Sequence, residues 1–320
     1  GYKKLLLATG AKPRKLPFSD EHVIYYRTLP DYRRLRALAE NGRNFAVIGG
    51  GFIGAEIAAS LASSGKNVVM IFPGRGIGGR IFPAPLSAFV SDYYELKGVK
   101  LVSGEKIIGL ESRGNQRVLK TATNREIIVD GVVAGIGVEP NTLLAQSIGL
   151  EIEEGIVVDE RLRTSQPNIF AAGDVAAFYH AALKKRVRVE HEDNANSMGR
   201  AAGRNMAGAS EPYQHLPFFY SDMFELGYEA VGELDSRLDT FADWTRPNEE
   251  GVVYYLENER VRGVLLWNVW EQVEAARQLI AEPGPFSAAN LRGRLPIKLP
   301  AKQPENDSAS TLKFHESSTP

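Results

Sequence analysis

A glycine-rich turn between a predicted strand and a predicted helix constrains this chain more than any other feature. The segment FAVIGGGFIGAEIAAS, residues 45–60, places Gly49, Gly51 and Gly54 in G-x-G-x-x-G spacing. Gly49 permits a tight turn, Gly51 lets backbone N–H groups approach a phosphate, and Gly54 allows close packing of helix on strand. A second strand at residues 67–72 completes a βαβ unit, which requires a parallel sheet. The sequence therefore predicts an α/β domain that holds a dinucleotide pyrophosphate at a helix N-terminus.

The end of the second strand leaves the identity of this nucleotide open. An acidic residue that binds the adenine ribose is expected there, but the position is Phe72. No carboxylate is therefore present to favour NAD or to repel a 2′-phosphate. Arg75 and Arg80 follow on the next loop, and their guanidinium groups suit a phosphate. NAD and NADP both remain candidates at this point, and a solvated loop is the alternative for the two arginines.

Composition narrows the chemistry. The 320 residues include no cysteine, which excludes a disulfide framework, a thiolate metal site and a redox-active dithiol within this chain. Five histidines are scattered without metal-ligand spacing, so no metal is expected. A net charge of −1 favours neither nucleic acid nor an anionic membrane surface. Glu56 interrupts the apolar run at residues 45–65 and argues against a membrane span. Any redox chemistry is expected to come from an organic cofactor.

Local patterns predict the remaining elements. Residues 31–40 have helical periodicity with Asp31 as N-cap, and residues 107–121 alternate as in an antiparallel meander. A polar start followed by alanines and glycines predicts a helix near residues 190–208. Aromatic strands follow from Tyr213. Residues after about Lys298 are rich in Pro, Ser, Asn and charge and predict a disordered tail.

Three further motifs follow one another in an order that bears on the class of protein. The run LLLATGAKPR begins the chain, GIGVEPNTLLAQ follows the meander, and TSQPNIFAAGDVA comes next, with a predicted helix opening at its aspartate. Together with the glycine turn they resemble the two-dinucleotide flavoprotein reductases, which bind FAD and a nicotinamide nucleotide. The motif residues that this resemblance marks as cofactor-binding are Ala8, Thr9, Gly10, Gly137, Pro140, Gly173 and Asp174.

The resemblance is narrower in the second half of the chain. Segments 189–213, 218–236 and 251–268 are similar to the apoptosis-inducing-factor group of the ferredoxin-reductase-like flavoproteins. Similarity extends from Tyr2 to about Ile297. Two departures qualify it. The first FAD fingerprint is expected upstream of Gly1, so the chain reads as a fragment. The long C-terminal insertion of animal members is missing, which favours a bacterial-type relative.

The resemblance implies an α/β fold with two interleaved Rossmann-like dinucleotide-binding domains, the FAD domain incomplete, and a C-terminal α+β interface domain. The expected limits are 1–28 and 156–212 for the FAD domain, 29–155 for the NAD(P)H domain, 213–298 for the interface domain and 299–320 for the tail.

The resemblance also assigns roles to individual residues. Phe52 shields the flavin face, and Glu56 holds the nicotinamide carboxamide. Without such a polar partner, a charge on this apolar helix face would be unfavourable. Glu190 and His191 lie beside the flavin pyrimidine ring, ahead of a helix whose dipole stabilises negative charge. Tyr220 contacts the nicotinamide–flavin stack. Each of these side chains has a plain structural alternative as a core or surface residue.

The implied function is FAD-dependent NAD(P)H:acceptor oxidoreduction. Hydride passes from NADH, or alternatively NADPH, to FAD, and electrons then pass to a ferredoxin or a quinone-like acceptor. The alternative is a redox sensor whose reduced flavin–nicotinamide complex controls dimerisation or partner binding. The resemblance also allows a homodimer. The expected location is cytoplasmic, or mitochondrial in a eukaryote.

Overall fold

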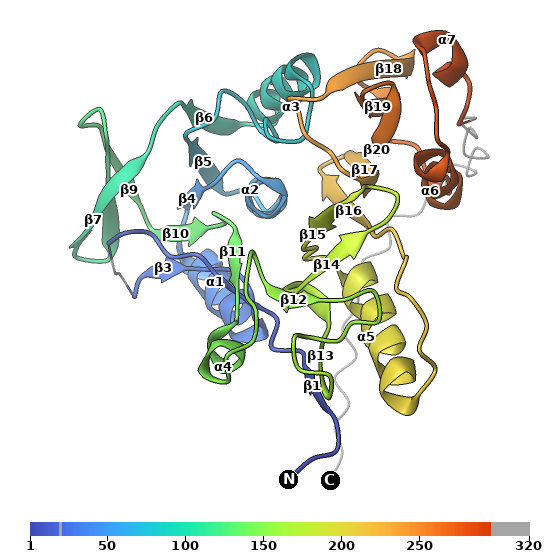
Figure 1. Cartoon of the computed structure of the whole chain (residues 1–320). Coiled ribbons are helices and arrows are strands. Elements are labelled where there is room, and N and C mark those ends of the chain that lie inside the picture. The colour runs from blue at the N-terminus through green and yellow to red at the C-terminus, as the bar shows by residue number, and fades with distance from the viewer. Residues whose placement is uncertain (19–20, 296–320) are drawn as a thin grey trace, which may run out of the picture.

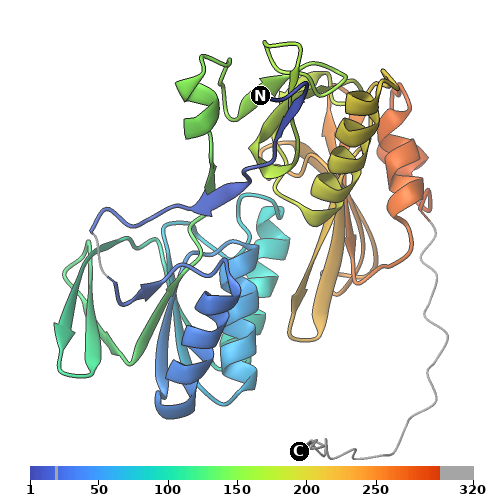
Figure 2. The same ribbon diagram turned by 90° about the horizontal axis from the view of Figure 1, so that it is seen from below.

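In the computed structural model, residues 1–18 and 21–295 are described and form three packed parts (Figures 1 and 2). A parallel sheet with its helices packs directly against a C-terminal antiparallel sheet, and a third part of short strands with a long helix lies beside both. The predicted tail at 299–320 lies outside the described residues. No helix within these described ranges is long and apolar enough to cross a membrane.

The predicted βαβ unit forms the centre of a five-stranded parallel sheet in the order β3-β10-β4-β5-β6. The strands are β3 (Val23–Ile24), β10 (Gly131–Ala134), β4 (Asn44–Ile48), β5 (Asn67–Phe72) and β6 (Val99–Ser103). The helices are α1 (Leu29–Asn41), α2 (Phe52–Ser63) and α3 (Ala84–Leu96). Because successive strand residues point to opposite faces, Phe45 and Val47 pack with the helices, while Ala46 and Ile48 pack on the other side.

That other face is covered by the predicted meander, which is confirmed. It consists of the antiparallel strands β7 (Ile107–Arg113), β8 (Gln116–Thr121) and β9 (Glu126–Val129). Leu119 and Val129 bury their side chains against the sheet. The meander and the helices therefore enclose the parallel sheet from opposite sides (Figure 1).

The start of α1 differs from the prediction. Thr28, not Asp31, is the N-cap, and the two residues form a capping box in which each side chain bonds to the other's backbone N–H. Pro30 lies in the first turn, where its missing N–H is no loss. Asp31 takes the third helical position of the box, so its carboxylate still satisfies an N-terminal donor.

The middle part joins segments that are far apart in the sequence. Strand β1 (Leu5–Leu7) pairs in parallel with β13 (Ile169–Ala171), and β2 (Ala11–Pro13) pairs with β11 (Val138–Pro140). The other elements are β12 (Ile156–Val158), β14 (Ala176–His180), β15 (Lys185–Val187), α4 (Leu143–Ser147), the 3₁₀ turn η1 (Gly173–Val175) and α5 (Glu192–Ala207).

The predicted helix at Asp174 is wrong in this part. Gly173–Val175 makes a single 3₁₀ turn, and the chain then continues as β14. Buried Phe178 on β14 pairs with Val158 on one side and Val187 on the other, so a central strand position outweighs helix formation. The helix that packs against this turn is α5, which begins at Glu192 close to the predicted position.

Two segments near the predicted domain limits pack as follows, and the limits themselves stay a prediction. β3 lies within residues 1–28, yet it is hydrogen-bonded into the parallel sheet. Ala145 and Leu150 lie within residues 29–155, yet they pack in the core of the middle part with Leu7. The chain therefore enters the parallel-sheet part before residue 28 and leaves it before residue 155.

The C-terminal part is an antiparallel sheet in the order β16-β17-β20-β19-β18. Its strands are β16 (Phe218–Met223), β17 (Leu226–Gly232), β20 (Arg260–Trp267), β19 (Glu250–Glu257) and β18 (Asp239–Arg246), and its helices are α6 (Val273–Ala281) and α7 (Ala288–Leu291). One face packs against α6. The other shares a core with the parallel-sheet part, where Phe82 meets Tyr228 and Trp267 edge-on at 5.4 and 5.3 Å between ring centroids.

Phe82→Ala tests this shared core. The ring is 2% exposed, so its loss should lower the free energy of unfolding by about 3–5 kcal/mol. Leu96→Ala, on a side chain that is 82% exposed, should change it by less than about 0.5 kcal/mol. Urea denaturation followed by circular dichroism measures both. A loss below about 1 kcal/mol for Phe82→Ala would contradict the shared core.

Candidate functional site

The geometry of the turn gives a different reason for glycine at each of its three glycine positions. Gly49 has φ +119°, and a Cβ there would lie closer to the carbonyl oxygen of Gly135 than real Cβ atoms lie to any neighbour. A Cβ on Gly54 would collide in the same way with the carbonyl oxygen of Gly49. Gly51 is the N-cap of α2, has no side-chain cap, and has open space where a Cβ would be. The helix therefore presents uncapped N–H groups to an open space, as an anion site requires.

Phe72 packs against the glycine turn. Its side chain is 2% exposed, and the ring lies 2.8 Å from the position of a Cβ on Gly50. The residue at the predicted ribose position is therefore part of the core and adds no polar group. Arg75 and Arg80 lie exposed on the loop that follows β5. Their contact with a phosphate stays a prediction.

Hydrogen bonds connect the motif LLLATGAKPR at the start of the chain with the motif GIGVEPNTLLAQ. The Thr9 hydroxyl donates to the Asn141 carbonyl oxygen at 2.7 Å, and the Asn141 side-chain amide donates to the Thr9 carbonyl oxygen at 2.8 Å. The Arg14 N–H donates to the Gly137 carbonyl oxygen at 2.9 Å, and β2 pairs with β11 up to Pro140. Gly10, with φ +65°, lies in the turn between β1 and β2, and its carbonyl oxygen accepts from the Asn141 N–H at 2.9 Å.

Several charged side chains lie around Asp174, the aspartate of the motif TSQPNIFAAGDVA. Arg27, the residue before the α1 cap, pairs with the Asp174 carboxylate at 2.9 Å. Arg188 donates to the Asp174 carbonyl oxygen at 3.1 Å and pairs with Glu190 at 2.6 Å. The sequence prediction missed both arginines. The pairing of Arg188 with Glu190 could have been predicted, because residues two apart in an extended segment point to the same side. The pairing of Arg27 with Asp174 has no local signal, because the two residues lie far apart in the sequence.

Three aromatic rings gather beside these charged side chains. His191, the N-cap of α5, stacks on Phe219 of β16 at 4.3 Å and 12°, and Phe52 of α2 lies 6.4 and 6.1 Å from the two rings. Burial lowers the pKa of His191 to about 4. Together with Glu190 these rings line one end of a cavity of about 360 Å³. All three parts of the molecule therefore contribute to one aromatic pocket.

Tyr220 does not lie in this pocket. Alternate residues of β16 face opposite sides, so Phe219 and Ser221 point towards α2 while Tyr220 points away. Tyr220 lies opposite Glu229 on β17 and is 59% exposed. The aromatic residue of β16 that lines the pocket is Phe219, one residue earlier in the strand, and the contact of Tyr220 with a nicotinamide–flavin stack stays a prediction.

Glu56 lies on the same side of α2 as Phe52, because residues four apart share a helix face. Its carboxylate accepts a hydrogen bond of 2.6 Å from the hydroxyl of Ser221, which is 1% exposed. Burial raises the pKa of Glu56, and this hydrogen bond opposes the rise. Sequence reasoning missed Ser221, since the contact depends on how β16 packs against α2.

Comparison with protein families identifies the class that this geometry defines. Residues 1–199 match the model of the pyridine nucleotide-disulphide oxidoreductases, and residues 202–250 and 246–282 match that of the C-terminal region of apoptosis-inducing factor. The chain belongs to the pyridine nucleotide-disulphide oxidoreductase family. The predicted resemblance to the apoptosis-inducing-factor group is thereby confirmed.

Individual relatives agree with this assignment. The chain is 36% identical to apoptosis-inducing factor 1 of Dictyostelium discoideum, over 87% of the chain and 57% of that protein. It is 30% identical to putidaredoxin reductase of Pseudomonas putida, over 93% of the chain and 73% of that protein. The chain thus spans little more than half the length of the Dictyostelium relative.

Solved structures show the same architecture. The covalent putidaredoxin reductase–putidaredoxin complex matches with a TM-score of 0.82 at 30% identity, covering 89% of this chain and 70% of that one. A ferredoxin reductase from Rhodopseudomonas palustris matches with a TM-score of 0.78 at 29% identity, covering 83% and 67%. These matches confirm the predicted α/β fold class with a C-terminal α+β part.

The glycine geometry predicts different results for two alanine substitutions. Gly54→Ala forces a methyl group into the backbone of the turn and should destabilise the protein by about 1–3 kcal/mol. Gly51→Ala enters open space in an extended conformation and should cost less than about 1 kcal/mol. Chemical denaturation of both variants is the measurement. Equal losses would show that α2 does not pack on the turn as described.

Proposed function

We propose that the protein is an FAD-dependent NAD(P)H:acceptor oxidoreductase. The observation that carries the proposal is the convergence of Phe52 and Glu56 from α2 with His191 and Phe219 from the other two parts. An acidic acceptor, an aromatic ring and an apolar wall suit the carboxamide and flat ring of a nicotinamide. The open glycine turn at the start of the same helix suits the pyrophosphate of that nucleotide.

The residues of the middle part suit FAD. Asp174 supplies an acceptor for ribityl hydroxyl groups, and Arg27 supplies a cation for a phosphate at the same place. Glu190 and His191 supply polar groups at the edge of the aromatic pocket. Bound FAD would supply the hydride-accepting and electron-releasing chemistry. The chain's own contribution is to hold these groups at the junction of three packed parts.

Each of these side chains has a separate task in this proposal. Glu56, oriented by Ser221, accepts a hydrogen bond from the nicotinamide carboxamide. Phe52 covers the pocket until the nicotinamide displaces it. The stacked rings of His191 and Phe219 exclude water from one side, which favours hydride transfer over side reactions.

The acceptor follows from the relatives. One matching structure is a complex with putidaredoxin, and another relative is named as an anthranilate dioxygenase ferredoxin–NAD(+) reductase component. We propose that a ferredoxin receives the electrons. The interleaved domains, a homodimer and a cytoplasmic location remain predictions.

The protein supplied with FAD, NADH and ferricyanide provides the test of function. Reduction of ferricyanide should require both FAD and NADH and should continue over many turnovers. Replacing ferricyanide with a ferredoxin coupled to cytochrome c tests the acceptor separately. A single slow reduction without turnover would favour a redox sensor, and no reduction at all would reject the proposed function.

Glu56→Ala tests the carboxamide contact. Loss of one hydrogen bond to a charged group removes about 1.5–3 kcal/mol, so NADH-dependent flavin reduction should slow by about 10- to 150-fold. FAD content should not change. Glu40→Ala, on an exposed residue of α1, is the control and should stay within about twofold. Stopped-flow measurement of flavin reduction gives the two rates. Equal rates for the two variants would show that Glu56 does not hold the nicotinamide carboxamide.

Arg75→Ala tests nucleotide preference. An exposed arginine–phosphate contact contributes about 1 kcal/mol, so NADPH efficiency should fall a few-fold while NADH efficiency stays unchanged. Because Phe72 provides no carboxylate, the two nucleotides should differ by no more than about a hundredfold, with NADH preferred. Steady-state kcat/KM with each nucleotide gives the answer. An equal effect on both would show that Arg75 does not contact the 2′-phosphate.

A further inference from the structure

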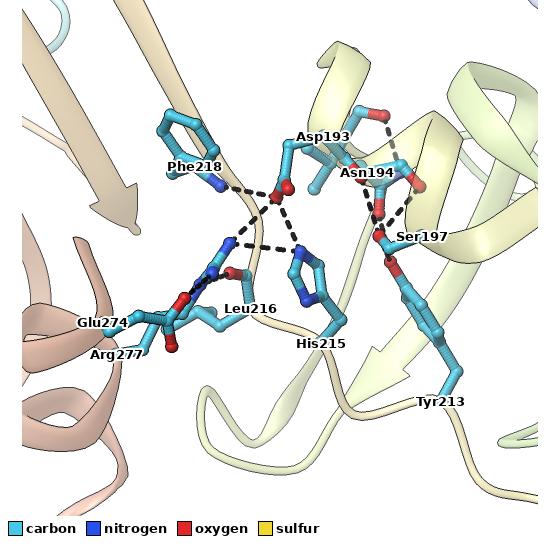
Figure 3. Close-up of polar contacts among 10 residues, drawn as sticks. Asp193, Asn194, Ser197, Tyr213, His215, Leu216, Phe218, Glu274 and Arg277 are labelled. Atoms are coloured by element: carbon cyan, nitrogen blue, oxygen red, sulfur yellow. Dashed lines mark hydrogen bonds and ion pairs between the residues drawn. The ribbon is translucent and has the colours of Figure 1, made fainter. Parts of the chain in front are cut away.

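One carboxylate oxygen ties three elements together next to the aromatic pocket (Figure 3). Asp193, in the first turn of α5, accepts through Oδ2 from His215 Nε2 at 2.6 Å, from Arg277 Nη2 at 3.0 Å and from the Phe218 N–H at 3.2 Å. His215 lies on the linker before β16, Phe218 begins that strand, and Arg277 lies on α6. Arg277 Nη2 also lies 3.1 Å from His215 Nε2, so the guanidinium, the imidazole and the carboxylate meet at one place (Figure 3).

Arg277 strengthens the same junction from the other side. Its Nε donates to the Leu216 carbonyl oxygen at 2.7 Å, its guanidinium lies 5.6 Å from the centre of the Phe218 ring, and Glu274 pairs with it. Its side chain is 17% exposed and that of Asp193 is 23% exposed, so solvent screens their attraction only in part. Charge-assisted hydrogen bonds of this kind are the stronger class.

The junction is directly connected to the stacked rings. His191 lies two residues before Asp193 and is the N-cap of the same helix, while Phe219 follows Phe218 in the same strand. The Phe218 N–H holds the strand to the helix at Asp193, and the ring of Phe219 stacks on the ring of His191. Any slip of α5 along β16 would have to break both contacts.

A second set of bonds holds α5 independently. The Tyr213 hydroxyl bonds to Asn194 Oδ1 and to Ser197 Oγ, both at 2.9 Å, and the Asn194 amide donates to the Val189 carbonyl oxygen at 3.1 Å (Figure 3). These contacts tie the helix to the linker and to its own preceding segment. They do not reach β16 or α6, so they preserve the helix but not its position relative to Phe219.

We propose that Asp193 is a positioning residue: by binding Phe218, His215 and Arg277 it holds the N-terminus of α5 against β16 and keeps the His191 ring stacked on Phe219. The role of the stack in hydride transfer rests on the proposed function, whereas the positioning itself depends only on these contacts.

The test compares two neighbouring acids of the first turn of α5. Asp193→Ala removes the junction, and Glu192→Ala removes the same charge from an exposed side chain that accepts a hydrogen bond from Asn196 at 3.4 Å. The readout is the pKa of His191, measured by NMR on the imidazole in the absence of nucleotide and assigned with His191→Gln. Loss of a negative charge alone lowers this pKa, since Asp193 raises it. Release of the ring to water raises it towards 6.5.

We expect Asp193→Ala to raise the pKa of His191 by at least about one pH unit, and Glu192→Ala to leave it unchanged. An unchanged or lowered pKa in folded Asp193→Ala would overturn the proposal. If that variant does not fold, Arg277→Met removes one of the three donors to Asp193 Oδ2, together with the contacts of Arg277 to Leu216, Phe218 and Glu274. This variant should raise the pKa of His191 by less and in the same direction, and an unchanged pKa would also overturn the proposal.

Turnover separates this proposal from the proposed function. In NADH-dependent ferricyanide reduction, Asp193→Ala should lower kcat by about tenfold with little change in KM, and Glu192→Ala should stay within about twofold. A raised pKa in a protein without NADH-dependent turnover would support the positioning role and reject the function. An active protein whose two variants match in pKa and kcat would support the function and reject the positioning role.

Discussion

The close approach of backbone to backbone at the glycine turn is the constraint on which the site depends. Gly49 and Gly54 leave no room for side chains, so α2 begins against the end of β4 and projects along the sheet in one direction. This direction decides where Phe52 and Glu56 point, because both lie on one face of α2. A parallel sheet places its strand ends and helix starts along the same edge, where ligands bind in such folds. The turn therefore sets both the anion site and the pocket next to it.

The C-terminal sheet supports the site through the face that does not pack against α6. One face packs Tyr228 and Trp267 against Phe82 and so fixes the sheet to the dinucleotide part through a shared core. The same face carries Phe219 and Ser221 to α2, where the Phe219 ring lines the pocket and the Ser221 hydroxyl donates to Glu56. Burial of large aromatic side chains provides the free energy that keeps these two polar and aromatic contacts in register.

Charge around the N-terminus of α5 joins the third part to the other two. Asp193 lies where the helix dipole favours a negative group, and it meets Arg277 and His215 from the C-terminal region. Asp174 and Glu190, on the other side of His191, meet Arg27 and Arg188 in the same manner. Two groups of paired charges thus lie near His191 at the edge of the aromatic pocket. Membership of the pyridine nucleotide-disulphide oxidoreductase family agrees with this arrangement.

The sequence by itself determined the features that depend on short spacing. These are the glycine turn, the shared face of Phe52 and Glu56, the meander, and the motif order that indicates the family. The tertiary structure alone decided the features that depend on register and long-range packing. Strand alternation selects Phe219 over Tyr220, β14 replaces the helix expected at Asp174, and the partners of Glu56 and Asp174 come from distant segments. Local propensity and spacing act within a few residues, whereas these choices follow from which surfaces of separate elements are buried together.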